Sequence, residues 1–95
     1  MKKLEALALV KKCLRGKKDT WHVISFNYSG YHVAAKCHGT WAQRVTATEL
    51  DNEGNQSIVL RDASSMDITQ KACVAFFESF LDCLDELRED SKNVN

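Results

Sequence analysis

The stretch DITQKACVAFFESFLDCLDEL, residues 67–87, decides the fold. Asp67 stands at an N-cap position, and Gln70 three residues later completes a capping box. Apolar side chains then recur at steps of three and four residues, the spacing that places side chains on one face of an α-helix. They are Cys73, Phe76, Phe77, Phe80, Leu84 and Leu87. A helix alone cannot bury three phenylalanine side chains of its own, so the sequence predicts a broad apolar surface packed against this face.

A second helix is predicted at the start of the chain, over Lys2–Arg15, with Gly16 as its C-terminal stop. Its apolar stripe consists of Leu4, Leu7, Val10 and Leu14.

The segment between the helices is rich in β-branched and aromatic residues, which is typical of strands. Strands are predicted at Thr20–Tyr28, Tyr31–His38, Thr40–Leu50 and, more briefly, Gln56–Arg61. A tight turn at Ser29–Gly30, a loop at 51–55 and a connection at 62–66 join them. Short connections favour neighbouring antiparallel strands. The predicted fold is therefore α+β, a two-layer sandwich with an antiparallel meander of three to four strands between two helices, in the order α-β-β-β-β-α.

Composition places the chain among small single-domain proteins. Its 95 residues contain no proline, and 13 basic residues balance 13 acidic ones. We expect one domain over residues 1–90 and a disordered tail at 91–95. The apolar run Leu4–Val10 is interrupted by Glu5 and lacks a signal-peptide cleavage site, and nothing reaches the roughly 20 apolar residues of a membrane span. These features predict a cytoplasmic protein.

Four cysteines are spread through apolar segments, at Cys13, Cys37, Cys73 and Cys83. Cys73 and Cys83 lie about 15 Å apart along one helix, too far to form a disulfide with each other. Reduced, buried thiols are the simpler expectation for an intracellular protein.

Two kinds of reactive site are candidates, a zinc site and a cysteine nucleophile. His22, His32, Cys37 and His38 are residue types that bind zinc, but strand alternation points Cys37 away from His32 and His38. The same alternation separates a Cys37 nucleophile from the adjacent histidine. No catalytic motif is present, so the sequence predicts a protein that is not an enzyme, with no metal site and no cofactor.

A basic surface is a further candidate. In the third strand Trp41, Val45 and Ala47 share one face, which is expected to meet the helix. The open face would then carry Ala42, Arg44, Thr46, His32, Lys36 and His38, a surface that could follow a phosphate backbone. The basic first helix would extend it. The resulting alternative is a nucleic-acid-binding module that uses Lys11, Lys12, Arg15, Lys36 and Arg44.

The helix–strand–helix order, together with the turn Ser29-Gly30-Tyr31-His32, resembles the double-stranded RNA-binding domain in outline. The chain departs from that family in two respects. Its last helix begins with Lys71 alone where the family has a lysine-rich start, and four strands are counted here. The sequence is therefore not assigned to that family.

Charge is segregated along the chain. Residues 2–18 hold seven of the 13 basic residues, and residues 78–90 hold six of the 13 acidic ones. Either the two helices lie side by side and complement each other, or one of them is an interaction surface.

The chain has more aromatic residues than one face of the sheet can bury. In the first strand Trp21 and Val23 alternate out of phase with Ile24, Phe26 and Tyr28. Either a β-bulge shifts the register near Val23, or both sheet faces are partly apolar and one exposes a patch typical of a binding surface or homodimer.

The function expected from the sequence is binding of another protein, with a second copy of the chain as one candidate partner and no role for a membrane. Small size and the lack of catalytic motifs are shared, by analogy, with accessory or inhibitor proteins of phages and mobile elements. The predicted contacts are aromatic anchors and an acidic helix face. They are Trp21, Tyr28, Tyr31, Trp41, Glu78, Asp82, Asp85 and Glu86.

Overall fold

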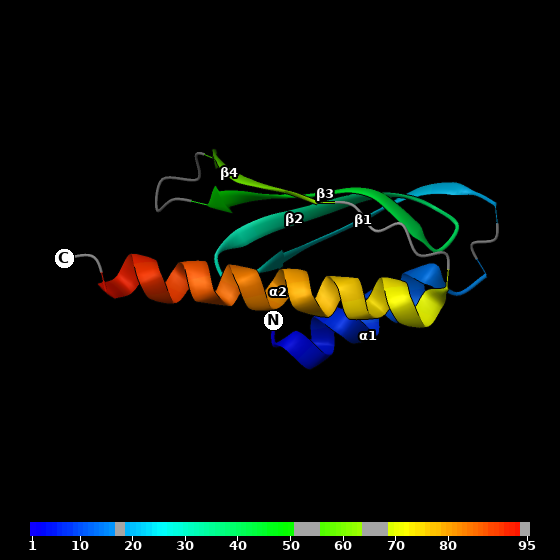
Figure 1. Ribbon diagram of the computed structural model, residues 1–95, viewed down its shortest axis with the longest axis horizontal. Coiled ribbons are helices and arrows are strands. Elements are labelled where there is room, and N and C mark those ends of the chain that lie inside the picture. The colour runs from blue at the N-terminus through cyan, green and yellow to red at the C-terminus, as the bar shows by residue number, and fades with distance from the viewer. Residues whose placement is uncertain (17–18, 51–55, 64–68, 94–95) are drawn as a thin grey trace.

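The chain folds into one antiparallel sheet with two helices on one of its faces (Figure 1). The computed structural model describes the backbone of residues 1–16, 19–50, 56–63 and 69–93, and the side chains of residues 1–16, 19–50 and 69–90. The strands are hydrogen-bonded in the order β1-β2-β3-β4. In chain order the elements are α1 (Lys3–Leu14), β1 (Trp21–Tyr28), β2 (Tyr31–His38), β3 (Trp41–Leu50), β4 (Gln56–Ala63) and α2 (Gln70–Asn93). The predicted α+β class is confirmed.

Helix α2 begins later and ends later than predicted. The backbone N–H of Ala72 donates to Thr69 Oγ1 at 3.1 Å, so Thr69 provides the cap. Gln70, predicted to complete a capping box with Asp67, donates from Nε2 to the backbone oxygen of Lys11 at 3.5 Å. The helix continues to Asn93, past the predicted start of a tail at 91. Asp67, the predicted loop at 51–55, the connection from residue 64 and residues 94–95 lie outside the described residues.

Two tight hairpins set the register of the first three strands. Tyr28 pairs with Tyr31, and His38 pairs with Trp41, which leaves two residues in each turn. Ser29 and Gly30 both have positive φ, 53° and 81°, as a type I′ turn requires. The predicted turn at Ser29–Gly30 is confirmed.

The core lies between the helices and the inner face of the sheet, the face that they cover. Among the described side chains of α2, Cys73, Phe77, Phe80, Leu81 and Leu84 are buried, whereas Phe76 and Leu87 are only partly buried at the margin of the core. From α1 come Ala6, Leu7, Val10 and Leu14. The prediction for Leu4 is wrong, because this residue is 79% exposed. At 3.6 residues per turn Leu4 lies about 120° around the helix from Val10.

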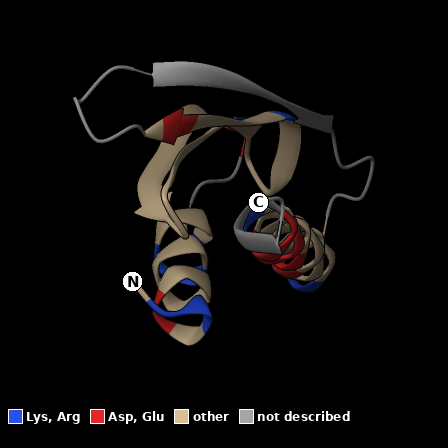
Figure 2. Cartoon of the chain, turned by 90° about the vertical axis from the view of Figure 1, so that its left-hand side faces the viewer, with Lys and Arg blue, Asp and Glu red and all other residues tan. Residues whose placement is uncertain are grey.

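The two helices pack side by side under the sheet. Figure 2 looks onto the end of the molecule where the basic start of α1 and the acidic residues of α2 lie next to each other. There Lys3 Nζ lies 3.0 Å from Asp82 Oδ1, and this hydrogen bond raises the pKa of Lys3. At this pair the segregated charges complement each other within the chain. Over the described residues, neither helix has both the length and the apolar character to cross a bilayer.

Candidate binding surface

Strand β1 exposes apolar side chains on the outer face of the sheet, the face opposite the helices. Trp21 is 53% and Val23 69% exposed, whereas Ile24, Phe26 and Tyr28 point inward and are buried. The β1–β2 pairing runs without a shift from Trp21–His38 to Tyr28–Tyr31. Of the two alternatives for this strand, the structure therefore has the one in which both sheet faces are partly apolar.

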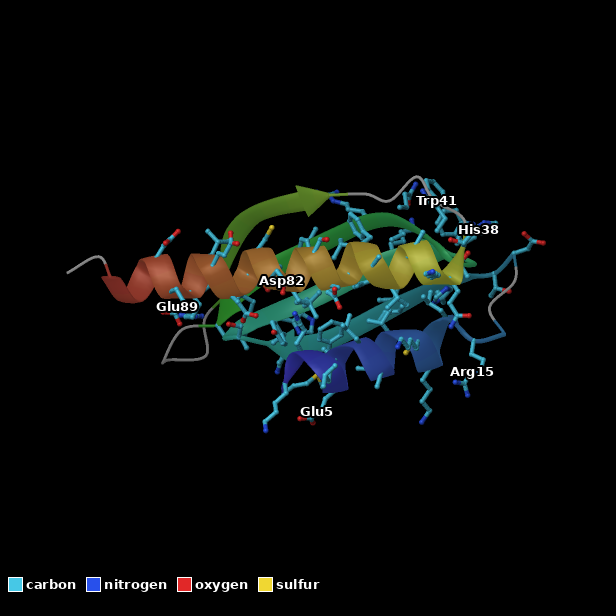
Figure 3. The ribbon with its side chains drawn as sticks, turned by 60° about the horizontal axis from the view of Figure 1, so that its bottom comes forward. Glu5, Arg15, His38, Trp41, Asp82 and Glu89 are labelled. Carbon is cyan, nitrogen blue, oxygen red and sulfur yellow. The ribbon has the colours of Figure 1, made fainter. Side chains whose placement is uncertain are left out.

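A row of three ring-bearing residues crosses the outer face at the β2–β3 hairpin. Trp21 pairs with His38, which pairs with Trp41. The rings of Trp21 and His38 have centroids 4.8 Å apart and are tilted by 52°, and Lys36 Nζ lies 5.2 Å from the Trp21 ring centroid. Figure 3 shows His38 and Trp41 together at this end of the sheet. A cation over an indole face is a favourable contact, so this contact stabilises the positions of the Lys36 and Trp21 side chains.

Trp41 reaches the outer face because of a β-bulge. Lys36 pairs with Arg44 but Cys37 pairs with Ala42, so Gln43 has no partner on β2. The extra residue reverses the alternation of β3 at this point. The prediction that Trp41 shares a face with Val45 is therefore wrong, and Ala42, predicted to be on the open face, is fully buried.

A second row joins an apolar residue to two cations. Val23 pairs with Lys36, and Lys36 pairs with Arg44. This row borders a shallow hollow of about 180 Å³. Its lining consists of Val23, Ala34, Ala35, Lys36, Arg44 and Thr46. A wider hollow, of about 590 Å³, lies between the helices and is lined by Lys11, Gln70, Lys71, Val74, Ala75 and Glu78.

Two of the four predicted aromatic anchors are not on the surface. Tyr28 and Tyr31 are 5% and 4% exposed, because the even alternation of β1 and its pairing with β2 turn both rings inward. The Tyr28 hydroxyl donates to Asp85 Oδ2 at 2.8 Å. The Arg88 guanidinium lies 4.8 Å from the Tyr31 ring centroid. These two tyrosines join the sheet to α2, and their prediction as exposed anchors is wrong.

The predicted acidic surface is partly used inside the molecule. Asp82 pairs with Lys3, and Asp85 accepts the hydrogen bond of Tyr28. Glu78 and Glu86 are exposed on α2.

The five basic residues of the nucleic-acid alternative do not form one surface. Lys36 and Arg44 are exposed on the outer face of the sheet. Lys11 and Lys12 are exposed on α1, which packs on the inner side, and Arg15 is exposed at the C-cap of the same helix. Figure 3 shows Arg15 on the helix side, away from His38 and Trp41.

The candidate metal ligands are dispersed. His22 Nε2 donates to the backbone oxygen of Gly39 at 2.8 Å, and His32 Nδ1 contacts Asn27 Oδ1 at 2.9 Å. The His38 ring lies tilted against that of Trp21, and Cys37 is buried on the other face. Within the described part of the chain, no three His, Cys, Asp or Glu side chains are grouped so that they could hold a metal ion.

The four cysteines are free thiols, with Cys37 and Cys73 fully buried and Cys13 and Cys83 partly buried. Burial raises the pKa of Cys37 to about 12 and that of Cys73 to about 11. A buried thiol that stays protonated at neutral pH lacks the properties of a nucleophile. Burial and the hydrogen bond to Asp85 also raise the pKa of Tyr28.

These raised pKa values predict alkaline instability. The folded state favours the protonated form of all three groups, so their stabilising effect is complete below the ordinary pKa values of 9.0 and 10.0. It is lost as pH rises from there through the raised values, by up to about 1.4 kcal/mol per pH unit for each group. Urea unfolding followed by tryptophan fluorescence should show a free energy of unfolding that falls above about pH 9. The fall beyond pH 10 should be shallower in Tyr28→Phe. A free energy that stays constant to pH 11 would contradict this expectation.

One residue that sequence analysis did not single out is Arg88. Its Nε–H donates to the backbone oxygen of Ser29 at 3.0 Å, and Nη1 lies 3.7 Å from Glu49 Oε1. A Cβ added at Gly30 would meet this guanidinium, so the glycine also provides room for it. The available signal was that Arg88 is the single basic residue among the six acidic residues of 78–90.

Comparison with known proteins gives no relative: no family model matches the sequence, and no curated protein or solved structure matches it either.

Proposed function

We propose that this protein binds another protein through the outer face of its sheet, with the four-stranded meander as the platform and the helices as its support. The observation that carries the proposal is the exposure of Trp21 and Val23, 53% and 69%, next to each other on the sheet face opposite α1 and α2. Tryptophan is enriched among the residues that dominate binding energies, and exposed apolar patches on small proteins mark interaction sites. The proposal involves no catalytic step.

We place the binding surface on the outer face of the sheet and not on the acidic face of α2. Of its acidic residues, Asp82 and Asp85 have partners within the chain, whereas the outer face combines Trp21 with Trp41, His38 and Lys36. An accessory or inhibitor role would follow if the bound surface of the partner were one that it needs for its own activity.

Nucleic-acid binding is the second candidate, favoured by Lys36 and Arg44 on the same face. It requires exposed aromatic rings on which bases can stack. The Trp21 ring already contacts His38 and Lys36, which leaves less of it for a base. The neighbouring hollow is bordered by Val23 and Ala34, which suit an aliphatic side chain. The partly covered Trp21 ring and the apolar hollow both favour a protein partner over a nucleic acid.

Photo-cross-linking tests the proposal. A benzophenone amino acid is placed at position 23 on the outer face and, as a matched control, at position 4 of α1, where Leu4 is also exposed and apolar. In a lysate of the native host, a defined protein adduct is expected from position 23 and not from position 4. The cross-linked protein is then purified, and its binding is measured by calorimetry.

Trp21→Ala should weaken binding of this purified partner by about tenfold or more, because truncating a central aromatic anchor costs more than about 1 kcal/mol. Leu4→Ala should change the Kd by less than about twofold, and circular dichroism would verify that both variants are folded. Equal cross-linking from the two positions, or an unchanged Kd in Trp21→Ala, would refute the proposal.

A further inference from the structure

Resting on the proposed function, we further propose that the partner binds as an extended polypeptide segment, which pairs with the free edge of β1 as a fifth strand of the sheet. The free edge consists of the backbone N–H and C=O groups of Trp21, Val23, Ser25 and Asn27. Alternate side chains of the segment would lie beside Trp21 and Val23 on the outer face, and the others would lie over α1.

The β1–β2 hairpin determines which backbone groups of β1 form this edge. In a two-residue hairpin the residues on either side of the turn, here Tyr28 and Tyr31, exchange two hydrogen bonds, and every second pair along the strands does the same. The backbone N–H of Gly39 donates to the backbone oxygen of Thr20 at 2.9 Å, which agrees with this alternation. The odd-numbered residues of 21–27 therefore direct their N–H and C=O groups away from β2. In the part of the chain that the structure describes, β1 pairs with β2 and with no other strand.

This edge lacks the features that usually prevent the addition of a strand. Edge strands of natural proteins are protected by lysine and other charged side chains, by proline or by a β-bulge. Strand β1, with the sequence WHVISFNY, contains no charged residue and no proline, and it pairs with β2 without a shift. The sequence of β4, at the other edge, contains Arg61 and Asp62, and its pairing with β3 is irregular. A regular, uncharged edge such as that of β1 is suited to bind an extended peptide.

Apolar side chains lie on both sides of the position that a fifth strand would take. On the outer face these are the exposed Trp21 and Val23. On the inner face α1, whose main neighbour in the sheet is β1, lies at this edge (Figure 3). Its Leu9 and Cys13 are only half-buried. Both lie about 160° around the helix from Lys11, which lines the hollow between α1 and α2, so they face away from α2. A fifth strand with apolar residues at alternate positions would cover them.

The position of α1 argues against a second copy of the chain as the added strand. In a symmetric dimer the two β1 strands would lie about 4.8 Å apart, with each α1 below its own β1. Packed helices need about 8–10 Å between their axes, so the two α1 helices would collide. An extended segment with no helix below it meets no such obstacle.

Peptide binding tests the inference with a defined probe. The probe is the fluorescein-labelled peptide Lys-Thr-Val-Thr-Val-Thr-Val-Thr-Lys, the valine peptide. One comparison peptide carries N-methyl groups on two neighbouring central residues, which removes one N–H from each of its edges, and another has serine for every valine. Anisotropy gives each Kd. The valine peptide should bind about tenfold more tightly than the N-methyl peptide, which loses backbone hydrogen bonds, and several-fold more tightly than the serine peptide.

Amide exchange locates the added strand. In the protein alone the N–H groups of Val23, Ser25 and Asn27 should exchange fast, whereas those of Ile24 and Phe26, which face β2, should exchange slowly. A saturating amount of the valine peptide should slow exchange of the first three by about tenfold or more and leave the other two unchanged. If these three amides are protected without peptide in a chain that sediments as a dimer, the edge is occupied by a second copy and the inference is wrong.

The matched variants are Ser25→Pro and Ser25→Ala. Both remove the hydroxyl group, but only proline removes the N–H of the free edge, and edge strands tolerate proline on their solvent side. Ser25→Pro should weaken binding of the valine peptide and of the cross-linked partner by about tenfold, and Ser25→Ala by less than about twofold. Circular dichroism verifies folding, and if Ser25→Pro is unfolded the amide exchange decides. The inference fails if the two folded variants bind alike or if the valine peptide does not bind.

The same variants separate this inference from the proposed function. If Trp21→Ala weakens binding of the cross-linked partner but Ser25→Pro does not, the outer face stands as the binding surface and the fifth strand is wrong. If Trp21→Ala has no effect on that partner, the proposed function itself is wrong.

Discussion

Phe77→Ala should lower the free energy of unfolding by about 3–5 kcal/mol, because it removes a fully buried ring and leaves a cavity. Domains of this size are stable by only about 5–15 kcal/mol, so the loss is a large part of the total. Urea denaturation followed by circular dichroism measures it. If Phe77→Ala is unfolded without denaturant, Phe77→Leu, with an expected loss of about 1–2 kcal/mol, keeps the expectation measurable.

Phe76 provides the matched control. Its ring lies edge-on to that of Phe77, at 6.1 Å between centroids and an interplanar angle of 83°, but it is only partly buried. Phe76→Ala should therefore cost clearly less than Phe77→Ala. Equal losses would mean that the centre of the α2 interface has been assigned to the wrong residue.

Arg88→Ala should lower the free energy of unfolding by about 2–3 kcal/mol. The substitution removes a charged hydrogen bond to Ser29, typically worth about 1.5–3 kcal/mol, and a cation–π contact to Tyr31. Arg88→Lys keeps the charge but not the planar guanidinium that makes both contacts, so it should restore less than half of the loss. Urea denaturation of these variants gives the comparison.

The control for Arg88 is Arg15→Ala, at the exposed C-cap position of α1, which should change the free energy of unfolding by less than about 0.5 kcal/mol. Amide exchange in the turn at Ser29–Gly30 should become faster in Arg88→Ala only. Similar effects of the two alanine variants would show that Arg88 does not join α2 to the β1–β2 hairpin.

Local patterns were enough to predict both helices, the first three strands and the hairpin turn. The Ser29–Gly30 dipeptide needs no tertiary context to favour positive φ, and the apolar spacing of α2 is a property of its own sequence. The start of α2 was missed, because Asp67 and Thr69 are both good N-caps and only the folded chain distinguishes them.

The candidate site was only partly predictable. Exposure of Trp21 follows from its alternation with Ile24 and Phe26, and the structure confirms it. Tyr28 and Tyr31 were predicted to be exposed because the chain has more aromatic residues than one sheet face can bury. In the structure α1 and α2 lie side by side under the sheet. Asp85 contacts Tyr28 and Arg88 contacts Tyr31, and sequence periodicity cannot show such contacts.

The unpaired Gln43 makes β3 one residue longer than regular pairing with β2 requires. Loss of Gln43 would leave Ala42 opposite Cys37 and Trp41 opposite His38 in regular alternation, so Trp41 would stay on the outer face and Ala42 in the core. The aromatic content of the outer face is therefore insensitive to a deletion at this position, and homologues that lack the bulge residue should still carry their large residue opposite His38.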